Sequence, residues 1–240
     1  MSRWLVVGLA CLLLWAQKKK SSKADSEAAS SSPTPAQKMY LRAVQYGDPL
    51  TQIVALHWRL ATEGTSFGLR DTLAQAYFQG GFYRQAIAVA EELLREQPRN
   101  ADLAELRALA YFYLQDTKNA LDAYEKLYEI TQSPLHLYQV ITLQFNLQRY
   151  GECHANIERL LSSPEAERLT VRISTQGGET QEVPLKAAAL NVRGVLYRIQ
   201  KEPEKAKAAF EEALKIFPSF LLAKGNLEDL SREASGSTKK

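Results

Sequence analysis

Hydrophobic side chains recur at intervals of three and four residues through most of this chain, from Gln37 to Leu230. That spacing places them on one side of an α-helix. The helical segments are short, and they are rich in Ala, Leu, Glu, Gln and Lys, which are strong helix formers. The pattern predicts an all-α array of paired helices over residues 37–230.

The helical segments recur along the chain at a nearly constant spacing. Ala120 follows Ala86 by one full period, Cys153 follows Ala120 by one residue less than a period, and Ala206 follows after one more period and an insertion. Small side chains are needed where the two helices of a pair cross closely, and these four positions provide them. A single pair cannot bury its apolar face alone, so the period predicts a stack of helix pairs.

The stretch from Leu73 to Pro98, LAQAYFQGGFYRQAIAVAEELLREQP, resembles the tetratricopeptide repeat. It has the small residue Ala74, the turn glycine Gly81 and the second small residue Ala86 at the family's spacing. The first repeat is degenerate, because Tyr40 and Gln52 occupy its small-residue positions. The resemblance implies a right-handed α-solenoid of about four to five helix pairs, with a C-terminal capping helix over 219–230.

The insertion before the last repeat carries a different pattern. Leu169, Val171 and Ile173 alternate with polar residues, a turn with two glycines follows, and Val183 belongs to a returning segment. This alternation predicts a β-hairpin inserted at about 165–185. An isolated hairpin is marginally stable in water, so its apolar face must be covered. Two interpretations stay open: a loop docked on its own chain, or an exposed edge strand that makes a homo-oligomer or partner contact.

In the tetratricopeptide repeat family the first helix of each pair lines a concave groove that binds peptides or helices. The resemblance therefore assigns partner binding to eleven positions of this chain. These are Asp71, Gln75, Phe78, Glu105, Leu109, Phe112, Tyr113, Tyr138, Thr142, Phe145 and Asn191. The family's clamp for a peptide carboxylate needs Lys and Asn where Asp71 and Glu105 stand. The groove is expected to take an apolar segment with basic flanks, unless its aromatic residues belong to the core between repeats.

Residues 1–16 form a separate apolar segment. Arg3 precedes an unbroken run of apolar or small residues, Trp4 to Ala16, which as a helix covers about 20 Å and is shorter than a bilayer core of about 30 Å. This predicts a cleaved signal peptide, and the Ala-Gln-Lys ending resembles secretory signals of the Bacteroidetes. Lipidation at Cys11 and a retained membrane anchor are the alternatives. Residues 17–36 are expected to be a disordered linker, and 231–240 a disordered tail.

Composition excludes several classes of protein. Lys and Arg total 30 against 27 Asp and Glu, and this net charge of +3 is too small for an electrostatic nucleic-acid binder. Two cysteines cannot build a cysteine-rich zinc site. No phosphate loop and no hydrolase or metalloprotease motif occurs. We expect no catalytic residues, no metal and no cofactor, an inert buried Cys153 in spite of its neighbour His154, and a packing role for Trp58.

These observations predict a non-catalytic scaffold that binds a protein or peptide. The N-terminal segment predicts export to the periplasm or cell envelope. The alternative is a membrane-tethered subunit of an envelope assembly or transport complex, held by a lipid on Cys11 or by an uncleaved anchor.

Overall fold

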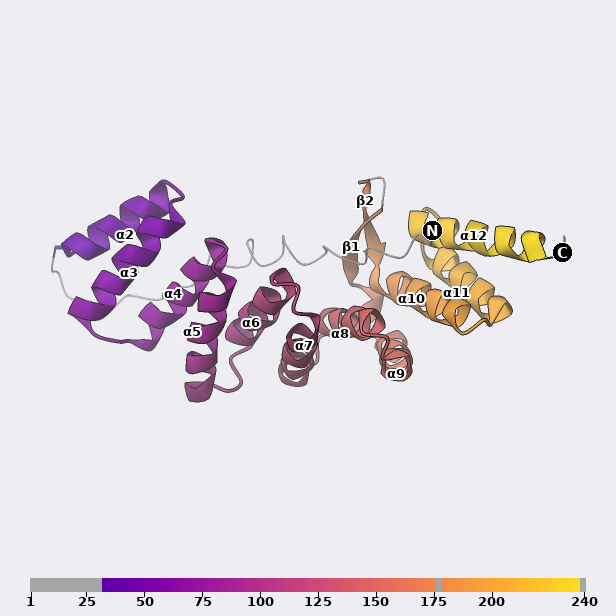
Figure 1. Ribbon diagram of the computed structural model, residues 1–240, viewed down its shortest axis with the longest axis horizontal. Coiled ribbons are helices and arrows are strands. Elements are labelled where there is room, and N and C mark those ends of the chain that lie inside the picture. The colour runs from indigo at the N-terminus through magenta and orange to yellow at the C-terminus, as the bar shows by residue number, and fades with distance from the viewer. Residues whose placement is uncertain (1–31, 176–177, 238–240) are drawn as a thin grey trace. The chain divides into compact units, whose positions relative to one another are not determined.

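The computed structural model describes residues 32–175 and 178–237 (Figure 1). The chain divides into two compact units. The N-terminal unit ends at Gln132. Its helices are α2 (Pro35–Gln45), α3 (Pro49–Glu63), α4 (Phe67–Gln79), α5 (Tyr83–Glu96), α6 (Ala101–Tyr113) and α7 (Thr117–Thr131). Consecutive helices pack as the pairs α2–α3, α4–α5 and α6–α7.

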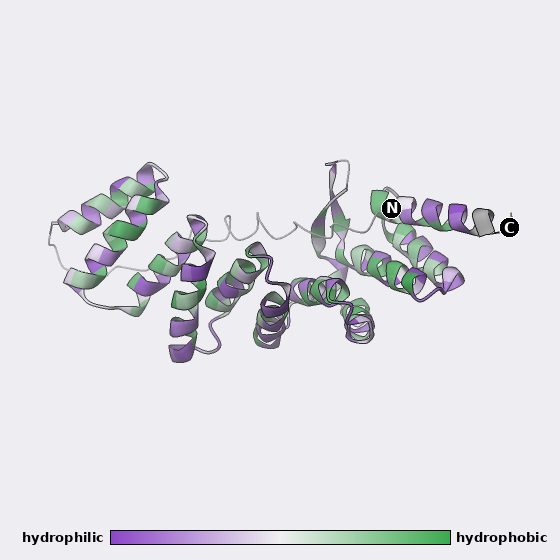
Figure 2. Cartoon of the chain, viewed as in Figure 1, coloured by the Kyte–Doolittle hydropathy of each residue, from purple (hydrophilic) through white to green (hydrophobic). Residues whose placement is uncertain are grey.

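The C-terminal unit begins at Ser133. It comprises α8 (Pro134–Asn146), α9 (Tyr150–Ser162), the short 3-10 helix η1 (Glu165–Glu167), β1 (Thr170–Ser174), β2 (Thr180–Pro184), α10 (Leu185–Ile199), α11 (Pro203–Ile216) and α12 (Leu221–Ser237). The described residues thus contain five helix pairs, one hairpin and a last helix against α11, which confirms the predicted fold class. Hydrophobic and hydrophilic residues alternate along the helices, as expected for helices with one packed side (Figure 2).

Two segment boundaries differ from the prediction. Helix α2 begins at Pro35, inside the predicted linker, because Thr34 caps it by accepting a hydrogen bond from the Gln37 amide at 3.2 Å. Helix α12 continues to Ser237, so the predicted tail begins within a helix. The predicted segment 1–16 and most of the linker lie outside the described residues.

The turns inside the helix pairs share one backbone conformation. Gly47, Gly81 and Gln115 hold the same place in successive repeats and have φ of 63°, 78° and 58°, and Gln148 and Lys201 in the later pairs have φ of 58° and 60°. These values lie in the left-handed region that glycine adopts without strain. The prediction of a turn at Gly81 is confirmed, and the later turns hold larger residues in the same conformation.

The small-residue positions are the closest contacts within the pairs. Ala86, Ala120 and Ala206 are fully buried. Gly194 is the clearest case, because a Cβ atom built on it would lie 2.4 Å from Cε1 of Phe210. Only glycine fits there, which confirms the role that the repeat pattern predicts for small residues.

Cys153 occupies another of these positions and is also fully buried. Its Sγ donates to the Ile141 carbonyl oxygen at 3.4 Å. Burial raises the pKa of the thiol to about 12, so the sulfur stays protonated and inert.

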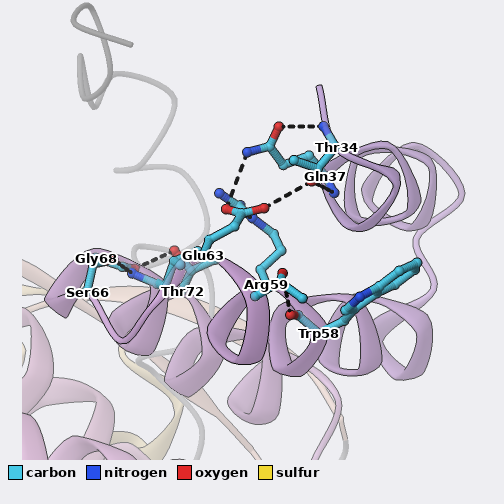
Figure 3. A network of polar contacts seen from close by, with 10 residues as sticks. Thr34, Gln37, Trp58, Arg59, Glu63, Ser66, Gly68 and Thr72 are labelled. Atoms are coloured by element: carbon cyan, nitrogen blue, oxygen red, sulfur yellow. Dashed lines mark hydrogen bonds and ion pairs between the residues drawn. The ribbon is translucent and has the colours of Figure 1, made fainter. Parts of the chain in front are cut away.

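The pair α2–α3 is closed by a polar network around Glu63 (Figure 3). The Glu63 carboxylate accepts from the Thr34 hydroxyl at 3.0 Å, from the Gln37 side chain at 3.3 Å and from Arg59 Nε at 3.0 Å. Burial opposes ionisation of this carboxyl, but the three hydrogen bonds outweigh it and lower its pKa. The network ties the N-terminus of α2 to the C-terminal end of α3.

Trp58 on α3 does not pack in the core as predicted. Its side chain is 45% exposed, and in Figure 3 the indole projects from α3 away from the Glu63 network. The prediction was wrong because the buried side of α3 is already filled by Ile53 and Leu56, which lie on another face of the helix.

The inserted hairpin is docked on its own chain. Its strands are antiparallel, with Val171 opposite Val183 and Ile173 opposite Gln181. The three apolar residues are buried, and both strands contact α10. Gln181 adds a polar anchor: its side chain donates to the Ser219 carbonyl at 2.9 Å and accepts from the Leu221 amide at 2.9 Å, at the start of α12. The apolar face is therefore covered by the chain itself, while an edge contact with a partner stays a prediction.

Candidate protein-binding surface

Four aromatic rings gather where α4, α5 and α6 meet in the N-terminal unit. Tyr83 stacks on Tyr113 with ring centroids 4.9 Å apart and an interplanar angle of 11°. Phe78 meets both rings edge-on, at 5.5 Å from Tyr83 and 5.7 Å from Tyr113. Phe112 lies 6.1 Å from Tyr113, also edge-on. We call these four residues the aromatic cluster. All four side chains are partly exposed, so the cluster has apolar surface to offer.

Carboxylates accompany the aromatic cluster on both first helices. Asp71 precedes Phe78 by seven residues on α4, and Glu105 precedes Phe112 by seven residues on α6. Seven residues are two helical turns, or about 10 Å along the axis. Asp71 accepts a hydrogen bond from the Gln75 side chain at 2.9 Å, so these two predicted site residues are in direct contact. Acidic groups thus stand two turns before aromatic rings at equivalent places on α4 and α6.

The repeat adds two residues that sequence reasoning missed. Leu41 and Val44 on α2 lie one full repeat before Gln75 and Phe78, and their side chains are 59% and 48% exposed. They occupy the same repeat positions on the first helix of the preceding pair. The repeat period was the available signal, but the degenerate first repeat concealed it. Tyr83 was also missed, although it follows the turn glycine at a fixed spacing.

Four of the predicted site residues are buried instead of lining a surface. They are Leu109, Tyr138, Thr142 and Asn191. Burial raises the pKa of the Tyr138 phenol, and the Thr142 hydroxyl donates back to the Gln139 carbonyl at 2.8 Å. For these residues the surface prediction is corrected, because neighbouring groups already surround their side chains.

Helix α12 explains the burial of Asn191. The Asn226 side chain of α12 donates to Oδ1 of Asn191 at 2.9 Å, and Arg198 on the same helix α10 donates from Nε to Glu233 at 3.2 Å. Phe145 on α8 packs against the cluster of Val195 and Phe210. The partly exposed candidate residues that lie outside this packing, Asp71, Gln75, Phe78, Glu105, Phe112 and Tyr113, all belong to the N-terminal unit.

Metal ligands do not assemble into a site in the described part of the chain. No three His, Cys, Asp or Glu side chains stand close enough there to hold a metal ion. His154 makes a 3.3 Å contact with the Tyr197 hydroxyl, which joins α9 to α10. Across residues 32–175 and 178–237, no helix is both long and apolar enough to cross a membrane.

Family comparison explains the recurring geometry. Two models described as tetratricopeptide repeat match the chain, one over residues 72–134 and one over residues 187–220. The matched segments contain the small buried residues Ala86, Ala120, Gly194 and Ala206. The chain contains tetratricopeptide repeats. Repeats of this family serve as protein-interaction scaffolds, and the aromatic cluster lies within the matched residues 72–134.

Solved tetratricopeptide repeat structures share the fold at low sequence identity. YrrB, described as having an unusual peptide-binding site, is 16% identical, with a TM-score of 0.58 over 81% of this chain and 91% of its own. A repeat protein from Parabacteroides merdae is 17% identical, with a TM-score of 0.58 over 81% of this chain and 70% of its own. MamA from Desulfovibrio magneticus RS-1 is 12% identical, with a TM-score of 0.55 over 78% and 95%. Among curated proteins, no sequence matches.

Proposed function

We propose that this tetratricopeptide repeat protein is a non-catalytic adaptor that binds a peptide or helix of a partner protein on the first-helix face of its N-terminal unit. The observation that carries the proposal is the aromatic cluster, whose four rings are partly exposed and hold one another in place. Ordered aromatic rings bury much apolar area and lose little side-chain entropy on binding. The peptide-binding site of YrrB supports the same use of the fold.

The chemistry of this face defines the ligand. Leu41, Val44 and the aromatic cluster supply apolar contacts, while Asp71 and Glu105 supply negative charge two turns away. The matching ligand is an apolar anchor flanked by Lys or Arg. Its affinity should fall with added salt, because the two carboxylates are partly exposed to solvent and salt screens their attraction for the ligand.

The test is a binding titration with two labelled peptides that share Leu and Phe anchors and differ only in Lys or Glu flanks. We expect the Lys-flanked peptide to bind more tightly. Phe112→Ala should weaken its binding at least tenfold, about 1.4 kcal/mol, because that ring provides anchor contact. The matched control is Leu114→Ala, since Leu114 is the C-cap residue of the same helix, 37% exposed, and has no ring contact with the cluster.

Two outcomes would contradict the assignment. Equal affinity for the Lys- and Glu-flanked peptides would contradict the proposed role of the acidic residues. If the proposal is correct, Asp71→Lys should make the Glu-flanked peptide the tighter binder. Unchanged binding in Phe112→Ala, with circular dichroism showing an intact fold, would place the site elsewhere.

The proposed location is the cell envelope, after export directed by residues 1–16. The alternative is a chain tethered to a membrane by Cys11 lipidation or by the retained segment, within an envelope assembly. The exposed apolar side chains of the adjoining pair α2–α3 support the tethered alternative, because apolar surface of this kind can contact a membrane. Intact mass of the native protein separates the three forms: loss of 1–16, an added acyl mass on Cys11, or the full chain.

A further inference from the structure

The second helix of the first pair carries an unusual exposed stripe. Leu50, Val54 and Trp58 follow one another at four-residue spacing on α3, and their side chains are 59%, 57% and 45% exposed. We call these three residues the α3 stripe. Of the ten large hydrophobic side chains exposed in the described residues, six lie on α2, α3 and the turn between them. The exposed apolar side chains are therefore concentrated on one helix pair and are not scattered singly over the surface, as they are on most proteins.

The other repeats show what ordinarily stands at the stripe positions. Counting forward by the repeat period from the α3 stripe gives exposed, mostly charged residues on α5 and α7. The corresponding positions of α11 in the C-terminal unit are also exposed and mostly charged. They are Arg84, Ala88 and Glu92 in α5, Lys118, Asp122 and Lys126 in α7, and Glu204, Ala208 and Glu212 in α11. These positions face solvent in the repeat, so the α3 stripe is not misplaced core. It is an outer face on which apolar residues replace charged ones.

The N-terminal end of the described structure lies near the α3 stripe, and this position indicates what the stripe contacts. The Thr34 hydroxyl donates to Glu63 at 3.0 Å, so the chain enters the structure beside the C-terminal end of α3, and Figure 3 shows Thr34, Glu63 and Trp58 in this one region. Seventeen residues, 17–33, separate this point from the apolar run Trp4–Ala16. A chain of that length reaches at most about 60 Å. If the run is held in a membrane, the C-terminal end of α3 lies within about 60 Å of that membrane and can reach its surface.

We infer that the α3 stripe rests on a lipid bilayer surface in the membrane-tethered form of the protein. Trp is enriched at the boundary between headgroups and acyl chains, where Trp58 would lie, and Leu50 and Val54 would enter the same layer. Lys18, Lys19 and Lys20 closely follow the apolar run and would favour anionic lipid. The stripe itself contains no carboxylate that such a surface would repel, unlike Glu92 and Asp122 at the equivalent positions.

The size of the stripe favours lipid over a second copy of the chain. Three side chains about half exposed, each contributing on the order of 100 Å², offer about 300 Å² of apolar surface. A symmetric dimer would then bury about 600 Å² in total, below the roughly 1,000 Å² expected of a specific interface. A tethered surface contact needs less, because the tether keeps the local concentration of lipid high. The inference rests on the tethered alternative and is independent of peptide binding by the aromatic cluster.

The test uses Trp58 as its own probe. The full chain contains three tryptophans, so Trp4→Phe with Trp15→Phe leaves Trp58 as the only indole. This chain is reconstituted into vesicles of phosphatidylethanolamine and phosphatidylglycerol, with or without lipids that carry a doxyl quencher near the headgroup. We expect the Trp58 emission to shift to shorter wavelength and at least half of it to be quenched. Val54→Glu should abolish the quenching.

Ala88→Glu is the matched control, because Ala88 occupies the position of Val54 in the next repeat and should leave the quenching unchanged. A chain that floats with vesicles while Trp58 stays unquenched overturns the inference, as does a chain that fails to float. A shift to shorter wavelength that grows with protein concentration in the absence of lipid would assign the stripe to a second copy instead. Peptide binding by the same protein is measured separately, so loss of one property does not imply loss of the other.

Discussion

The same repeat positions have different fates in the two units. On α4 and α6 they carry Phe78, Phe112, Tyr113 and two carboxylates, whose side chains stay partly exposed, while Leu109 on α6 is buried. On α8 and α10 they carry Tyr138, Thr142 and Asn191, which are buried, and Phe145, which packs against core residues. On α10 this face holds the additional helix α12 through Asn191 and Arg198. The comparison teaches that one repeat position can be partly exposed in one unit and covered in the other, as α12 covers Asn191.

The close packing of the C-terminal unit gives the largest expected effect. Gly194→Val would place side-chain atoms inside the Phe210 ring, since even Cβ would lie 2.4 Å from it. We expect the free energy of unfolding to fall by about 3 kcal/mol or more, measured by urea denaturation. Gly68→Val on α4 is the control, because a Cβ at Gly68 has nothing within 4 Å. Equal losses in the two variants would show that the units do not differ in this way.

Asn191 and Gln75 provide a comparison of intermediate size. Asn191→Ala removes the acceptor of the Asn226 amide of α12, and we expect a loss of about 1–3 kcal/mol together with faster hydrogen exchange in α12. Gln75→Ala breaks only the half-exposed bond to Asp71 and should cost less than about 0.5 kcal/mol. Exchange in α12 that is unaffected by Asn191→Ala would mean that this bond does not hold the helix.

The turns are where the two units should respond alike. Gln115 in the N-terminal unit and Lys201 in the C-terminal unit have φ of 58° and 60°. Replacing either with glycine relieves the left-handed strain but adds freedom to the unfolded chain, so we expect a net gain of about 0.5 kcal/mol in each case. Thermal unfolding of the two single variants measures it. A loss at either turn would show that the larger side chain makes a compensating contact.

The helical array could be predicted from the sequence because its determinants are local and periodic. The spacing of Ala86, Ala120 and Ala206 located three pairs, and the alternation around Val171 located the hairpin. The predictions that failed concerned residues whose exposure depends on contacts between helices distant in the sequence. Whether Asn191 faces solvent is decided by Asn226 on α12, far along the chain, and no periodic signal reports that contact.

The first pair shows the opposite failure. Trp58 was expected to pack because large apolar side chains usually do, yet α3 presents it to solvent. The hydrophobicity of a single residue does not show whether it lies on the buried or the exposed side of its helix. The repeat period would have done so, because the equivalent positions on α5 and α7 carry Glu92 and Lys126.

The burial of Cys153 has a consequence for redox chemistry. Because burial raises the thiol pKa to about 12, very few molecules carry the thiolate at pH 7, and the thiolate is the species that attacks disulfides and alkylating reagents. The folded protein therefore tolerates an oxidising compartment without cross-linking through this cysteine. Because the sulfur becomes reactive only when α8 and α9 separate, its rate of alkylation reports how often that pair opens.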